Sequence, residues 1–134
     1  MDTQTIVTGY GPMNTCFLIT HDPLLAQLTG VRDLVAQMGL RVEIRPRPDL
    51  RGAGERDILV VDARGEARDL LSRMLGVSRG VRVPGRVLVI VDERASSEQR
   101  AELLDAGVMS AVPANPVRLA SLLAQAIRDA LDER

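Results

Sequence analysis

Asp57-Ile58-Leu59-Val60-Val61-Asp62 is an apolar run between two acids, and it decides the fold of this chain. Four consecutive aliphatic residues are typical of a strand that is buried on both faces, as in the centre of a parallel sheet. Two other runs have the same character, Cys-Phe-Leu-Ile-Thr at residues 16–20 and Val-Leu-Val-Ile-Val at residues 87–91. We therefore predict that these three runs are the central strands of one parallel sheet.

The segments around these runs complete an alternating order of strands and helices. Apolar residues recur at steps of three and four over residues 24–38 and stop at Gly39, which predicts one amphipathic helix. Residues 41–45 alternate polar and apolar side chains and are followed by Pro46, as expected of an edge strand. Similar patterns predict helices over residues 66–75, 96–106 and 116–131, and a short fifth strand over residues 108–112.

Capping residues mark the starts of the last two helices. Ser96 is followed three positions later by Gln99, which is the spacing of a capping box. Asn115 is a favourable N-cap, and Pro116 stands at the favoured first position of the final helix. Both helices are therefore expected to begin shortly after a strand ends.

Five strands that alternate with helices require parallel pairing, right-handed crossovers and helices on both faces of the sheet. Buried central strands and one alternating strand, second in the chain, predict an α/β fold with a doubly wound five-stranded parallel sheet of order 2-1-3-4-5. We expect one domain over residues 16–134. Residues 1–15 lack the basic start and apolar core of a signal peptide, and we predict that they are a disordered tail.

The composition excludes several classes of function. All 17 basic side chains of the 134 residues are arginines, so a Schiff-base lysine and the lysine of a phosphate-binding loop are excluded. The formal net charge is -1, and the aromatic residues are one Tyr and one Phe, which argues against direct nucleic-acid binding. No apolar stretch approaches the roughly 20 residues of a membrane helix, and the single cysteine fits a reducing cytoplasm.

Acidic residues follow three of the predicted strands and should gather at one edge of the sheet. These residues are Asp22, Asp62 and Asp92. Clustered carboxylates can hold Mg²⁺ through oxygen ligands, or one of them can act as a nucleophile toward phosphorus. The alternative is that they cap helices in strand-to-helix turns, which requires no chemistry and is the commoner role.

The sequence resembles the receiver (CheY-like) domain of bacterial response regulators over residues 16–131. Asp57 to Asp62 looks like the third strand of that family, with its phosphoacceptor aspartate at Asp62. Leu-Leu-Asp-Ala-Gly-Val at residues 103–108 resembles the end of its fourth helix, and Pro116 with the following leucines resembles the start of its fifth. The resemblance implies a flavodoxin-like (βα)5 fold, a role in two-component phosphorelay signal transduction or transcription regulation, and Mg²⁺ at Asp22 and Asp62.

The expected active site departs from the family pattern at three positions. Thr20-His21-Asp22 retains one of the two adjacent acids that bind Mg²⁺ in receivers. Asp92 stands where the family has a hydroxyl, and Asn115 replaces the lysine before the fifth-helix proline. Phosphoryl transfer needs positive charge around the developing anion, so these changes reverse the local field. Arg64 and Arg94 lie nearby in sequence, but neither replaces a buried lysine without a new geometry.

We therefore predict a pseudo-receiver, a non-enzymatic module without a cofactor that acts by protein–protein contact. The first alternative is a working receiver, which catalyses phosphoryl transfer to its own Asp62 with Mg²⁺. The second is a small doubly wound enzyme or ligand-binding module that uses the same acidic edge. The resemblance implies a protein partner or a homodimer through the face of the fourth helix, fifth strand and fifth helix. The domain is expected either to stand alone or to be followed by an output domain after Arg134, and the single cysteine and the composition favour a cytoplasmic protein.

Overall fold

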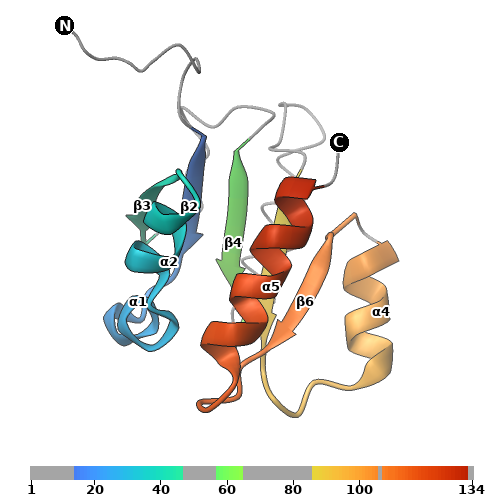
Figure 1. The fold of residues 1–134 in the computed structure, drawn as a ribbon. Helices are drawn as coiled ribbons and strands as arrows, with labels where there is room; N and C mark the ends of the chain where they lie inside the picture. The colour runs from blue at the N-terminus through green and yellow to red at the C-terminus, as the bar shows by residue number, and fades with distance from the viewer. Residues whose placement is uncertain (1–13, 47–56, 65–85, 106, 133–134) are drawn as a thin grey trace, which may run out of the picture.

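The computed structural model describes residues 14–46, 57–64, 86–105 and 107–132, which contain one five-stranded sheet (Figure 1). All neighbouring strands are parallel, and their spatial order is β3-β2-β4-β5-β6. The strands are β2 (Thr15–Ile19), β3 (Arg41–Arg45), β4 (Ile58–Asp62), β5 (Arg86–Val91) and β6 (Ser110–Pro113). Counted along the chain, this order is 2-1-3-4-5, so the predicted doubly wound sheet is confirmed.

The register of the sheet determines which side chains meet at its carboxyl edge. Ile19 is paired with Val61, so the next residues of the two strands, Thr20 and Asp62, lie side by side. Asp62 is paired in turn with Ile90 of β5. The three apolar runs that the sequence predicts as central strands therefore end at one edge.

The helix predicted over residues 24–38 is wrong in one respect, because the structure has two helices there. They are α1 (Pro23–Thr29) and α2 (Val31–Gln37), and Gly30 separates them with a φ of 58°. A left-handed residue ends a helix, and glycine adopts that conformation without a steric penalty. Gly39, with a φ of 76°, follows α2 as predicted.

The last two helices are α4 (Ser97–Asp105) and α5 (Leu119–Asp132). The predicted cap of α4 is confirmed, whereas Asn115 caps a turn over residues 116–118, and α5 begins at Leu119 rather than at Pro116 as predicted. The Ser96 and Gln99 side chains each accept the other residue's backbone N–H, at 3.1 and 3.0 Å. The Asn115 Oδ1 accepts the backbone N–H groups of Val117 at 2.9 Å and Arg118 at 3.1 Å. Each hydrogen bond satisfies a donor that has no partner within the helix.

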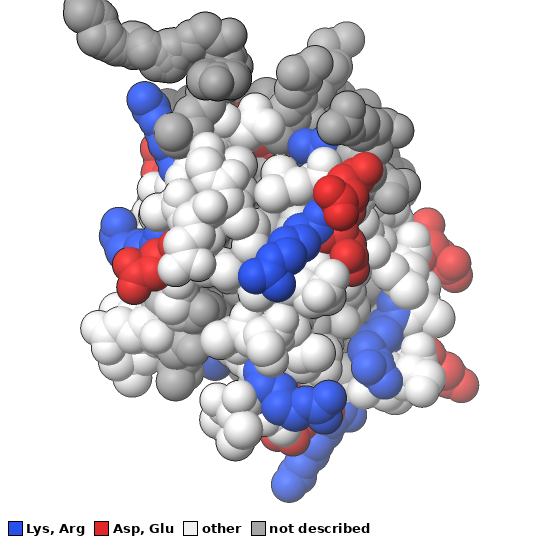
Figure 2. All heavy atoms as spheres, in the orientation of Figure 1, with Lys and Arg blue, Asp and Glu red and all other residues white. Residues whose placement is uncertain are grey.

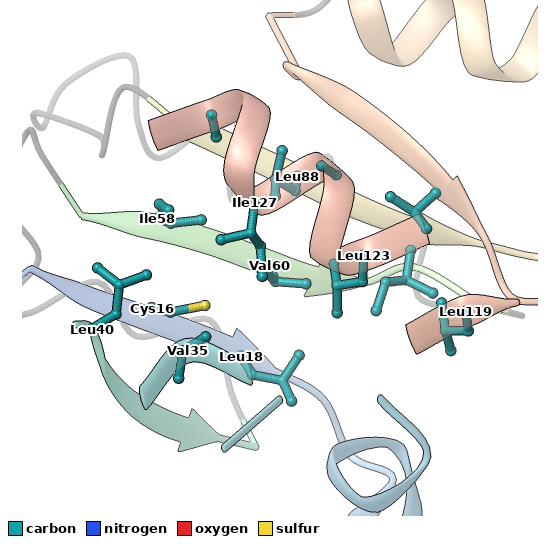
Figure 3. Packing of buried hydrophobic residues seen from close by; sticks show 14 of the residues in the cluster. Cys16, Leu18, Val35, Leu40, Ile58, Val60, Leu88, Leu119, Leu123 and Ile127 are labelled. Carbon is teal, nitrogen blue, oxygen red and sulfur yellow. The ribbon is translucent and has the colours of Figure 1, made fainter. Parts of the chain in front are cut away.

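The larger core cluster lies between the sheet and the three helices α1, α2 and α5 (Figure 3). Val60 and Leu88 from the sheet meet Leu123 and Ile127 from α5, and all four are fully buried. Burial of such a side chain contributes roughly 1.5–3 kcal/mol. Cys16 lies in the same cluster, and burial raises the pKa of its thiol to about 12, which makes it a small apolar group rather than a reactive thiol.

The other face of the sheet carries a second cluster, which includes Phe17, Val61 and Val89. Leu103 of α4 packs against it, and Figure 1 shows α4 beside β6. Because every residue of β4 from Ile58 to Val61 is buried, the central strand is covered on both faces, as its apolar run predicts.

Some expectations fall outside the described residues. Residues 1–13 of the predicted tail and the whole helix predicted over residues 66–75 belong to this part of the chain.

Strand β2 begins at Thr15, one residue before the predicted domain start, because Thr15 pairs with Arg41 and donates its N–H to Asp57 Oδ1 at 2.8 Å. Within the described residues, no helix has the length and apolar character needed to cross a membrane.

Candidate functional site

Asp62 is the centre of the candidate site at the carboxyl edge of the sheet. It is the last residue of β4, only 8% of it is exposed, and buried aliphatic residues precede it in the strand. Thr20, which follows β2, is 5% exposed and lies next to it. A buried carboxylate requires hydrogen-bond donors, so the groups that face Asp62 decide what it can do.

Each carboxylate oxygen of Asp62 accepts two hydrogen bonds. Oδ1 accepts from the backbone N–H of Arg64 at 3.2 Å and from the Arg64 Nε at 2.8 Å. Oδ2 accepts from the Arg64 Nη2 at 2.9 Å and from the Thr20 Oγ1 at 2.6 Å. A carboxylate offers about four lone-pair sites, and each of the four is met by a donor of the protein.

Asp22 is joined to the same guanidinium. Its Oδ2 lies 3.0 Å from the Arg64 Nη2, and its Oδ1 accepts the backbone N–H of Leu24 at 2.9 Å as the N-cap of α1. The backbone N–H of Asp22 donates to the Thr20 Oγ1 at 3.0 Å. The helix-cap interpretation of Asp22 is thus confirmed, and the expected meeting of Asp22 with Asp62 is confirmed as well.

The electrostatics of the group favour the charged forms. Burial by itself raises the pKa of Asp62, but the hydrogen bonds from Arg64 and Thr20 and the positive charge of Arg64 outweigh it, and its pKa lies below the usual value. The hydrogen bond to Asp62, aided by Asp22, raises the pKa of Arg64 above its usual value against the effect of burial. Asp22, Asp62 and Arg64 therefore form a closed network of two anions and one cation.

Asp92 and Asn115, the other predicted site residues, lie at the same edge of the sheet. Asp92 is exposed and lines an open depression of about 560 Å³, whose other lining residues are Arg64, Glu93, Arg94, Ala95, Gln99 and Ala114. Asn115 donates from Nδ2 to Glu93 Oε1 at 2.8 Å, while its Oδ1 caps the following turn. Both polar atoms of the Asn115 side chain are thus engaged away from Asp62.

Two residues of the network were not predicted as members of the site. Thr20 is the polar residue that ends an otherwise apolar run, and this contrast is the signal that could have identified it. The sequence indicates Arg64 only as a cation near the site, although it stands two residues after Asp62. Because Arg64 lies only two residues after Asp62, its guanidinium can fold back onto the Asp62 carboxylate. The Arg64 Nε and the Arg64 backbone N–H then both donate to the Asp62 Oδ1.

The predicted Mg²⁺ ligands, Asp22 and Asp62, are close together but share Arg64 between them. Within residues 14–46, 57–64, 86–105 and 107–132, no group of three or more His, Cys, Asp or Glu residues is arranged to hold a metal ion. His21 is exposed beside this network.

Comparison with known proteins relates the chain to one fold. No protein-family model matches the sequence, and no curated protein matches it. Among solved structures, a response regulator from Thermotoga maritima is 14% identical, with a TM-score of 0.70 over 91% of this chain and 100% of that chain. An orphan response regulator of H. pylori is 15% identical, with a TM-score of 0.64 over 90% of this chain and 99% of that chain.

A longer protein shows the same likeness over part of its length. Full-length FixJ from B. japonicum is 15% identical, with a TM-score of 0.60, and the match covers 87% of this chain but 59% of that chain. Likeness at this level of identity establishes architecture, and the strand order of the sheet agrees with it. The chain has the receiver (CheY-like) fold of response regulators.

Proposed function

We propose that this domain is a receiver-like signalling module that acts by binding a protein partner and does not use phosphorylation of Asp62. One observation carries the proposal: the Asp62 carboxylate accepts four hydrogen bonds from Arg64 and Thr20. The sequence resemblance puts Asp62 at the position of the phosphoacceptor, so in this proposal the state of its carboxylate decides whether the switch works.

A carboxylate that attacks phosphorus must present a free lone pair to the phosphorus atom. The guanidinium of Arg64 covers both oxygens of Asp62, and the lowered pKa of Asp62 makes the carboxylate a weaker nucleophile. Phosphoryl transfer also needs cations around the transferring group. Asn115, which replaces the family's lysine, is uncharged and holds Glu93 instead.

The face formed by α4, β6 and α5 supports the protein-binding part of the proposal. No residue of α4 is buried, and Leu104 on this helix is 50% exposed. Leu104 borders a shallow groove between α4 and β6, together with Ala101, Met109 and Ala111. A single exposed apolar residue is common, but apolar side chains gathered along one groove favour contact with another protein.

The distribution of charge favours a protein over a nucleic acid as the partner. Figure 2 shows acidic and basic groups interspersed on the face that carries α5, and the described residues of this face form no continuous basic area. Nucleic acid requires such an area, whereas a protein partner does not. The match to FixJ covers 59% of that chain, so a domain of this fold can be one part of a longer protein.

The phosphorylation part of the proposal is tested with a small phosphodonor. We expect the protein, incubated with acetyl phosphate and Mg²⁺, to gain no phosphoryl group by intact-mass spectrometry. A phosphoryl adduct that disappears in Asp62→Asn would instead establish the working receiver. A well-characterised phosphorylatable receiver, treated in parallel, controls for the activity of the phosphodonor.

The contact face is tested by association in solution. We expect concentration-dependent self-association, or binding to a separately expressed output domain, to weaken in Leu104→Arg, because an arginine would place a charge in the apolar contact. The matched control is Gln37→Arg, which adds the same charge at an exposed position of α2, outside the face formed by α4, β6 and α5. Equal loss in both variants, or no loss in Leu104→Arg, would contradict the α4 surface as the contact.

A further inference from the structure

We propose that Arg64 takes the place of a divalent metal ion between Asp22 and Asp62. It is a resident cation that joins the two carboxylates at the carboxyl edge of the sheet without any metal. This inference rests on the proposed function, because it explains how a receiver fold keeps its acidic edge intact once phosphorylation is no longer used. It assigns one side chain of this chain to a role that the receiver fold gives to Mg²⁺.

The distances make the guanidinium and a metal ion mutually exclusive. The Arg64 Nη2 lies 3.0 Å from the Asp22 Oδ2 and 2.9 Å from the Asp62 Oδ2, so one nitrogen bridges an oxygen of each carboxylate. A Mg²⁺ ion bound by the same two oxygens would lie about 2.0–2.1 Å from each, and Nη2 could not keep its position beside it. The residues present therefore do not accommodate Mg²⁺ while Arg64 remains in place.

The charges and the hydrogen bonds agree with this role. Asp22 and Asp62 together carry two negative charges. The Arg64 guanidinium supplies one positive charge, because it stays protonated at all physiological pH values. The remaining oxygens also have donors from the protein: the Asp22 Oδ1 accepts from the Leu24 backbone N–H, and the Asp62 Oδ1 accepts from the backbone N–H and the Nε of Arg64. A metal ion would have to displace hydrogen bonds that already satisfy the oxygens of both carboxylates.

The bridge also ties two structural elements together. Asp22 caps α1 through Oδ1 while it binds Arg64 through Oδ2, and Arg64 belongs to the turn after β4. Loss of the guanidinium leaves two adjacent carboxylates without their shared cation, one of them buried. Such a variant should be less stable, and an added divalent cation that binds the folded state should restore stability.

The experiment compares thermal unfolding of the wild type with Arg64→Gln, in EDTA and in tens of millimolar Mg²⁺. We expect the wild-type midpoint to be the same in both buffers. The midpoint of Arg64→Gln should fall by roughly 5–10 °C in EDTA and rise again by several degrees with Mg²⁺. The double variant Arg64→Gln/Asp22→Asn, which lacks one carboxylate, should lose most of the response to Mg²⁺.

Arg94→Gln is the matched control, because Arg94 is an exposed arginine that lines the same depression. It should unfold at the wild-type temperature and ignore Mg²⁺. The proposal is overturned if Mg²⁺ stabilises the wild type, if Arg64→Gln is as stable as Arg94→Gln, or if Arg64→Gln is destabilised but insensitive to the metal.

A second measurement keeps the proposal testable if Arg64→Gln does not fold. Mn²⁺ added to the ¹⁵N-labelled wild type should leave the amide signals of Thr20, Asp22 and Asp62 unbroadened, whereas selective broadening of these signals would overturn the proposal. The two proposals fail separately. A phosphoryl adduct on wild-type Asp62 contradicts the proposed function, and an Arg64→Gln variant insensitive to metal, without any adduct, contradicts only the resident cation.

Discussion

Arg64 meets Asp62 through a two-pronged ion pair, with Nε 2.8 Å from Oδ1 and Nη2 2.9 Å from Oδ2. This geometry matches the planar guanidinium to the planar carboxylate and is the strongest arrangement of the two groups. Both residues of the pair are largely shielded from water, with side-chain exposures of 26% and 10%. The pair therefore gives Asp62 a structural role at the carboxyl edge of the sheet.

The energy of this pair can be measured with a double-mutant cycle of Asp62→Asn and Arg64→Gln. We expect a coupling free energy of about 2 kcal/mol from urea unfolding, because residues in direct contact couple by about 0.5–3 kcal/mol and this pair is mostly buried. A coupling below about 0.5 kcal/mol, typical of exposed pairs, would show that the two residues act independently.

Thr20→Val tests the hydroxyl that completes the network. The substitution keeps the shape of the side chain but removes the 2.6 Å hydrogen bond to the Asp62 Oδ2. A hydrogen bond to a charged group contributes about 1.5–3 kcal/mol, so unfolding in urea should show a loss of this size. Thr20→Ser, which keeps the hydroxyl, is the control, and equal losses in both variants would contradict a role for the hydrogen bond.

The pH dependence of stability follows from the lowered pKa of Asp62. The folded protein holds this carboxyl below its usual pKa, so its contribution to stability is present above the unfolded pKa of about 3.9 and is lost as the pH falls through the folded value. The wild type should therefore exceed Asp62→Asn in free energy of unfolding at neutral pH, and this difference should shrink in acid. Urea unfolding of both proteins across the acid range measures it. A difference that stays constant would contradict the assigned cause.

Asn115→Lys introduces the lysine that the sequence resemblance to receivers leads us to expect at this position. We expect no phosphorylation of this variant by a small phosphodonor, because Arg64 and Thr20 still occupy the oxygens of Asp62. The substitution also removes the cap of the turn before α5, which should cost about 1 kcal/mol in the free energy of unfolding. Intact-mass spectrometry and urea unfolding test the two expectations, with Asn115→Asp as the control that preserves a cap. An Asp62-dependent adduct in Asn115→Lys would mean that the missing lysine, and not Arg64, blocks the reaction.

The sequence by itself determined the sheet and its order. The central runs are apolar up to the polar residues at their ends. A strand of this kind is stable when both its faces are covered, so the parallel doubly wound arrangement follows from local pattern. The caps at Ser96 and Asn115 were equally predictable, because their partners lie within three residues. Gly30 was missed, since a glycine inside an amphipathic pattern does not reveal that it will take a positive φ.

The tertiary structure alone decided the site. Thr20 and Asp62 are 42 positions apart in the chain, and so are Asp22 and Arg64. They meet because the register of β2 against β4 brings both strand ends to one edge. The departures at Asn115 and Asp92 predicted a weakened switch, but not which group would neutralise Asp62. An arginine side chain has many rotamers, and only the packed edge, with its two carboxylates, selects the one that bridges them.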